Sequence, residues 1–160
     1  MRQRGFTVLE VMIVVAAIAA LALLAAPFLA ATLGRADASQ SQSEAVSTLR
    51  EAQASAMSGL NNARYGVHFA GTQIVMFQGA AYSPADPNNV ARVLPSGISV
   101  VAVALSPGGA CALPAGTGNC DVHFVDHKGM PTETGSVTLA DEAGGTKTVS
   151  INAAGMIDPN

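Results

Sequence analysis

The side chain with the most unusual setting in this sequence is Glu10, a carboxylate near the start of a long apolar run. An ionised carboxylate inside a membrane-spanning helix costs roughly 2.5–3.5 kcal/mol, so we expect such a group to have a partner or a function. The simplest chemistry is an ion pair with a cation that comes from elsewhere. The alternative is a helix-end glutamate whose carboxylate reaches the polar edge of the membrane.

A second set of side chains has the chemistry of metal ligands: His68, Asp121, His123, Asp126 and His127. Asp121 and His123 stand two residues apart in an expected strand, so they share one of its faces. Residues 127–129 have the composition of a turn, and no further acid–base group accompanies the set. We therefore expect neither an enzyme nor a bound metal or cofactor.

The element that must position Glu10 is the apolar run that follows it. Residues 11–31 contain no charge over twenty-one positions, about the length that crosses a hydrocarbon core as a helix. A secretory signal peptide has a shorter apolar core, although the Ala-rich stretch around Ala25 leaves cleavage by signal peptidase as an alternative. Arg2 and Arg4 precede the run, so residues 1–5 are expected in the cytoplasm and the chain beyond about Leu33 outside.

The exported part of the chain is acidic. Two of the eight basic residues lie in the first five positions, which leaves six basic and eleven acidic residues from Phe6 onward, a formal charge of −5. A surface of this charge disfavours a broad electrostatic footprint for nucleic acid.

Residues 6 to about 58 contain one proline and one glycine and are rich in helix-forming residues, which predicts one long helix. Beyond about residue 33 its apolar residues recur at three- and four-residue spacing, so this half is expected to pack on a domain. The expected buried face carries Val46, Leu49, Ala56 and Met57, and Glu44, Arg50 and Glu51 are expected to be exposed.

The rest of the chain alternates between strand and turn patterns. Gly59, Asn61 and Asn62 indicate the end of the helix, and a hairpin is expected about Gly71. The expected strands are 65–69, 72–77, 98–105, 122–125, 137–139 and 148–151. The predicted fold class is α+β: a long N-terminal transmembrane helix packed on one antiparallel sheet. Its parts are a leader (1–5), a membrane helix (6–33) and an outward domain (34–160) whose β part covers 63–160.

Two cysteines, Cys111 and Cys120, are separated by eight residues in a segment rich in Gly, Pro and Ala. An exported domain lies in an oxidising compartment, which favours a disulfide that closes this loop. The alternative is a pair of free buried thiols.

Residues 5–10, GFTVLE, resemble the signature of the type IV pilin and type II secretion pseudopilin superfamily, from which they depart only at Val8. The resemblance implies that a prepilin peptidase cuts between Gly5 and Phe6 and methylates the amine of Phe6. That amine is cationic at neutral pH. In this family the glutamate, here Glu10, pairs with the N-terminal amine of a neighbouring subunit.

The resemblance also gives Pro27 an interpretation, because filament-forming pilins often carry a proline at this position, where the helix loosens during assembly. Physically a proline removes one backbone hydrogen bond and kinks or opens a helix. The alternative is a proline that the membrane helix merely tolerates.

A weaker resemblance covers the helix end (50–57) and the segments 122–131, 135–139 and 149–157, which look like the GspH/FimT group of minor pilins and pseudopilins. This implies a minor structural subunit of a type IV pilus or a type II secretion pseudopilus, held in the bacterial inner membrane and then in a periplasmic or extracellular filament. The implied partners are prepilin peptidase, other pilin subunits, inner-membrane lipid and an assembly-platform protein.

A minor pilin that binds DNA for natural transformation is the alternative function. Such subunits use basic residues in the C-terminal region, where this chain has Lys147 alone. Phosphate-driven affinity grows with the number of cationic contacts, so nucleic acid is not an expected partner. Arg64 and Arg92 remain as residues that would have to converge to form a basic patch.

Overall fold

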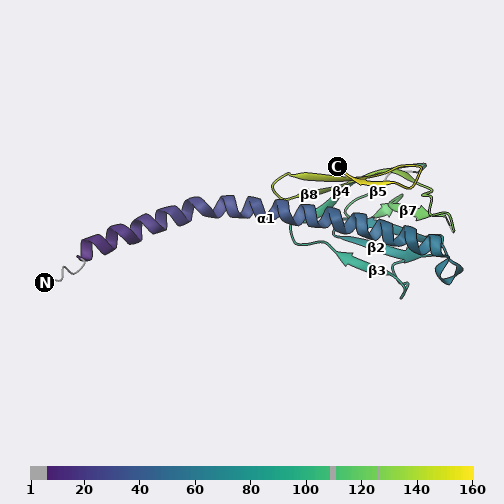
Figure 1. Cartoon of the computed structure of the whole chain (residues 1–160), viewed down its shortest axis with the longest axis horizontal. Coiled ribbons are helices and arrows are strands. Elements are labelled where there is room, and N and C mark those ends of the chain that lie inside the picture. The colour runs from purple at the N-terminus through teal and green to yellow at the C-terminus, as the bar shows by residue number, and fades with distance from the viewer. Residues whose placement is uncertain (1–6, 109–110, 126) are drawn as a thin grey trace. The chain divides into compact units, whose positions relative to one another are not determined.

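The computed structural model describes residues 7–108, 111–125 and 127–160. Within them lie one long helix, α1 (Val8–Ser58), a single 3-10 turn, η1 (Leu60–Asn62), and a series of short strands (Figure 1). The chain divides into two compact units, the first ending at Leu33 and the second running from Gly34 to Asn160.

Local interactions explain where α1 begins and where it ends. At the start, the hydroxyl of Thr7 accepts a hydrogen bond from the backbone N–H of Glu10 at 3.2 Å, as an N-cap residue does. At the other end Gly59 takes a left-handed conformation, with φ 64°, and left-handed glycine commonly ends a helix. The predicted helix is therefore confirmed, with its first helical residue at Val8 because Thr7 caps it.

The strands form two four-stranded antiparallel sheets and one small hairpin. Sheet A has the order β3 (Val90–Val93), β2 (Gln73–Gln78), β1 (Tyr65–Ala70) and β7 (Asp121–Phe124). Sheet B has the order β10 (Ile157–Pro159), β9 (Thr146–Ile151), β8 (Thr134–Asp141) and β4 (Ile98–Ser106). The hairpin pairs β5 (Cys111–Ala112) with β6 (Thr117–Gly118).

The α+β class is confirmed, and so is the hairpin of β1 and β2. The expectation of one sheet is wrong, because the six predicted strands divide between two sheets. Each sheet has its own apolar face, and the Gly34–Ser58 part of α1 supplies apolar side chains to both. In Figure 1 this part of α1 runs along the strands, with β4 and β8 on one side of it and β2 and β3 on the other.

The core is one cluster made by α1 and both sheets. The helix contributes mainly small residues, and small side chains allow its backbone to approach the strands closely. The fully or almost fully buried members of the cluster include Ala45, Leu49, Ala52 and Ala56 of α1, Val67, Phe69 and Phe124 of sheet A, and Val137, Leu139 and Val149 of sheet B.

Most of the predicted buried face of α1 is correct, but Met57 is not part of it. Val46, Leu49 and Ala56 are buried, whereas Met57 is 54% exposed. The side chain of Met57 lies over the backbone of Gly129, so it covers a turn and not the core. Of the residues expected to be exposed, Arg50 and Glu51 are exposed and Glu44 is half-buried.

Two glutamines fix α1 to the backbone of the β part. The Gln42 amide donates to the carbonyls of Thr148 and Asn160 at 2.7 and 2.9 Å. The Gln53 amide donates to the carbonyls of Gly129 and Gly155 at 2.8 and 3.0 Å. These bonds lie eleven residues apart along the helix, so they fix both its position and its rotation.

We expect Gln53→Ala to lower the free energy of unfolding of the second unit by about 1–3 kcal/mol, since it removes the donor shared by two part-buried carbonyls. Gln40→Ala is the matched control because Gln40 is exposed on the same helix, and its effect should stay within about 0.5 kcal/mol. The measurement is urea unfolding of the full chain in detergent, followed by circular dichroism. Equal losses for the two variants would contradict the anchoring role of Gln53.

Candidate functional site

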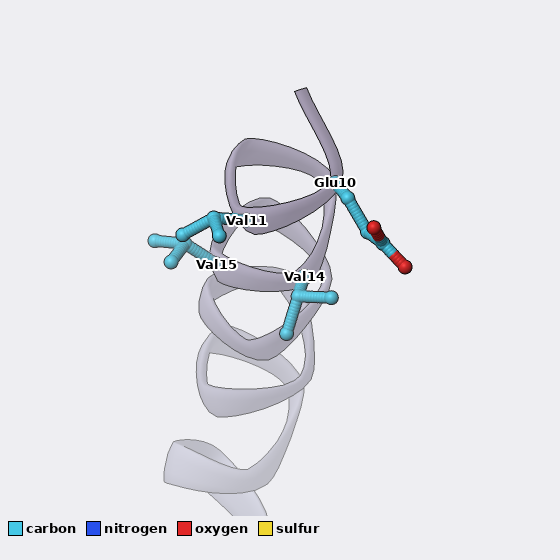
Figure 2. A pocket seen from close by; sticks show the side chains of 4 residues that line it. All are labelled: Glu10, Val11, Val14 and Val15. Atoms are coloured by element: carbon cyan, nitrogen blue, oxygen red, sulfur yellow. The ribbon is translucent and has the colours of Figure 1, made fainter. Parts of the chain in front are cut away.

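Glu10 lies in the first turn of α1 with its side chain exposed. Figure 2 shows the carboxylate pointing away from the helix, on a different side from Val11 and Val15. Together with Val14 these residues line a shallow hollow on the helix surface. No cation among the described residues lies within ion-pair distance of this carboxylate.

The helix itself offers Glu10 partial compensation. A carboxylate in the first turn interacts favourably with the positive end of the helix dipole, by about 0.3–1 kcal/mol at an exposed site. The sequence analysis assigned no role to Thr7. Thr7 and Glu10 nevertheless have the Ser/Thr-x-x-Glu spacing of a capping box, and this spacing could have identified Thr7 as the N-cap. The dipole term is smaller than the cost of a carboxylate in an apolar surrounding, so a further partner is still needed.

The other residues predicted to act with Glu10 are described only in part. Gly5 and Phe6 lie outside the described residues, and so does the side chain of Pro27, although α1 runs through that position. Among the described residues, no helix is both long and apolar enough to cross a membrane.

Three of the five residues considered as metal ligands lie in two separate pairs on the outer face of sheet A. His68 Nδ1 lies 2.5 Å from Asp121 Oδ1, and the His68 ring stacks on Tyr82 with centroids 3.9 Å apart. His123 Nδ1 lies 3.2 Å from Glu133 Oε2. Within the described part of the chain, no three His, Cys, Asp or Glu side chains come together to hold a metal ion.

These pairs belong to a second small packed layer. β1 is buried along almost its whole length, because Phe77 lies over Gly66 and Tyr82 stacks on His68 on its outer face. His127 lies elsewhere, against Gly59 at the end of the helix, and Asp126 is outside the described residues. Glu133 was missed by the sequence analysis, and no local pattern marks it, because its contact with His123 depends on tertiary structure.

The predicted disulfide between Cys111 and Cys120 is present. The loop that it closes covers the end of the β1–β2 hairpin: Phe69 and Gly71 donate backbone hydrogen bonds to the carbonyls of Cys120 and Pro114, at 3.0 and 2.9 Å. Gly116 of the same loop sits so close to His68 that a Cβ there would lie 2.8 Å from His68 Nε2. The disulfide loop therefore closes the outer layer of sheet A.

Arg92 does not contribute an uncompensated charge to a basic patch. Its guanidinium lies 2.6 Å from the Glu51 carboxylate and 3.9 Å from that of Glu44, both on α1. Arg64 lines a different hollow, together with His123 and Glu133. Since Arg92 is paired with two carboxylates, much of its charge is compensated at this surface.

Comparison with protein families finds a match on the segment around Glu10. Residues 1–26 match the model of the prokaryotic N-terminal methylation motif, the signal carried by type IV pilin-like precursors. A search of curated proteins finds no match to the chain. A search of solved structures finds none either.

Replacing both Cys111 and Cys120 by Ala should lower the free energy of unfolding by roughly 2–3 kcal/mol, the loop-closure term for a bridge of this span. The measurement is urea unfolding of the full chain in detergent, with and without reductant. Reductant should destabilise the parent chain by a similar amount and leave the variant unchanged. A parent chain whose stability is insensitive to reduction would contradict the structural role of this disulfide.

Proposed function

We propose that this chain, which carries the N-terminal methylation motif of type IV pilin-like precursors, is a minor structural subunit of a type IV pilus or a type II secretion pseudopilus. The observation that carries the proposal is the position of Glu10 within the matched segment, exposed and without a cation among the described residues. The subunit acts by assembly, with no reaction of its own, and aids filament initiation and protein secretion or pilus function. Its likeness to the GspH/FimT group favours a minor subunit.

Maturation supplies the cation that Glu10 lacks. Prepilin peptidase cuts between Gly5 and Phe6 and methylates the new amine, which is cationic at neutral pH. The amine then begins the mature chain, four residues before Glu10. A carboxylate and an ammonium thus enter the filament on the same helix end.

The pair forms between subunits. The first two turns of α1 expose apolar side chains, with Val8 79%, Leu9 69% and Met12 67% exposed, and neighbouring helices in a filament would cover them. Burying this surface also removes water from Glu10 and the amine, and each charge then needs the other. Because desolvation offsets much of their attraction, the pair fixes the axial position of the subunit more than it adds stability.

Before assembly the chain is held in the inner membrane by the apolar run 11–31, with the second unit on the outer side. The partners at this stage are lipid, prepilin peptidase and the assembly-platform protein. Extraction from the membrane into the filament replaces lipid around α1 with the helices of other subunits.

The processing step predicts a specific mass change. The protein extracted from membranes of its own host should lack the first five residues and carry one added methyl group on Phe6. Gly5→Leu should leave the precursor uncut, because a bulky side chain does not fit where the family requires glycine. Intact-mass analysis measures both. Normal maturation of Gly5→Leu would rule out this processing.

The pairing step predicts that Glu10→Gln is cut and inserted into the membrane normally but enters filaments poorly. The change keeps shape and hydrogen bonding and removes the charge. Leaving a buried amine unpaired costs about 3–5 kcal/mol, so incorporation should fall tenfold or more.

The readout for Glu10→Gln is the amount of variant in sheared filaments relative to the amount in the membrane. Glu142→Gln is the matched control, because Glu142 is exposed in the turn between β8 and β9, and it should assemble like the parent. If Glu10→Gln assembles equally well, Glu10 is merely tolerated and the pairing role is wrong.

A further inference from the structure

Two cations, Arg35 of α1 and Lys147 of β9, line the same hollow in the second unit. The hollow has a volume of about 260 Å³ and lies between the helix and the turn that joins β8 to β9. Its other lining residues are Ala38, Ser39, Asp141, Gly145 and Thr146. Among the described residues, no carboxylate lies within ion-pair distance of Arg35 or Lys147.

The one acid in the hollow, Asp141, is held by its own turn. Its Oδ1 accepts a hydrogen bond from the backbone N–H of Gly145 at 2.7 Å. The other acids on these two segments, Asp37 and Glu142, do not line the hollow. The hollow therefore holds two cations against one carboxylate, and neither cation is in ion-pair contact with that carboxylate, so an additional anion would be attracted to the pair of cations.

The sequence places this hollow close to the membrane, if the chain is anchored as proposed above. Arg35 follows the apolar run 11–31 by four residues, and four residues reach at most about 14 Å even when fully extended. The headgroup layer is roughly 5–8 Å thick on each side of the hydrocarbon core. Arg35 is thus confined to the neighbourhood of the outer headgroups, however the two units are arranged.

We propose that this hollow binds the phosphate of a phospholipid headgroup in the outer leaflet of the inner membrane. The Arg35 guanidinium and the Lys147 ammonium pair with the phosphate oxygens, and the exposed hydroxyl of Thr146 is a further donor. The contact would hold the β8–β9 turn against the membrane until the subunit is extracted into the filament. This inference rests on the membrane anchoring in the proposed function.

The test uses the full chain in vesicles of phosphatidylethanolamine and phosphatidylglycerol. A fluorophore on Ala143→Cys, at an exposed position of the turn, reports its distance from lipids that carry a quencher on the headgroup. Quenching should be strong for the parent and weak for Arg35→Gln/Lys147→Gln, with each lost cation weakening the contact roughly fivefold. Equal quenching in the two proteins would overturn the inference.

Lys128→Gln is the matched control for Lys147→Gln. Lys128 is exposed, and the neighbouring Gly129 packs on Met57, which is twenty-two residues, or about 33 Å of helix, from Arg35. Lys128→Gln should leave quenching unchanged. If it lowers quenching as much as Lys147→Gln does, the effect reflects general surface charge, and the proposed site is wrong. Circular dichroism verifies that all variants fold.

Two further measurements distinguish failure of the phosphate site from failure of the membrane anchoring. Millimolar inorganic phosphate should lower quenching more than chloride of equal ionic strength, because it competes for the same two cations, and equal loss in the two salts would overturn the phosphate site. Resistance of the chain to alkaline extraction from the vesicles measures anchoring independently. An anchored chain with an unquenched label refutes this inference alone, whereas an extractable chain refutes the proposed anchoring and the lipid contact with it.

Discussion

The packing of one face of α1 against both sheets is the constraint on which the rest of the fold depends. Ala38, Ala45 and Ala52 recur every seven residues and are almost completely buried, so the helix backbone can approach the strands closely. Buried residues of this helix face and of both sheets belong to one cluster. The hydrogen bonds from Gln42 and Gln53 to strand and turn carbonyls would be lost together if the helix slid by one residue.

The same helix has the opposite property before residue 34. Its described large apolar side chains from Val8 to Leu21 are more than half exposed, and none of the described residues buries them. A large exposed apolar surface is typical of a segment that contacts lipid or other helices. In the proposed function, lipid surrounds this segment first and the helices of other subunits surround it after assembly. Glu10 and the Phe6 amine are the charges that must pair when protein replaces lipid.

Sequence signals were sufficient where the cause is local. Composition, spacing and cellular compartment predicted three features correctly: the end of the helix at Gly59, the β1–β2 hairpin, and the disulfide between Cys111 and Cys120. The division into two sheets was not predictable in this way. β3 exposes most of its residues and β10 includes Pro159, so neither has the alternation of a typical strand, and both are defined by their neighbours.

The role of the histidines also depends on tertiary structure. His68 and Asp121 are 53 residues apart in the sequence, and only the pairing of β1 with β7 places them together. Their types suggested metal ligands, but a stacked tyrosine and the disulfide loop make them part of a packed layer. For Glu10, in contrast, residue type and spacing in the sequence were enough to suggest its function. The structure added the hydrogen bond from its backbone N–H to Thr7.

The most direct test of the central claim is a structure of the assembled filament at side-chain resolution. The account predicts that the methylated amine of Phe6 lies within about 4 Å of a Glu10 carboxylate that belongs to a neighbouring subunit. An amine paired with Glu10 of its own chain, or a Glu10 carboxylate with no cation beside it in the filament, would contradict the account.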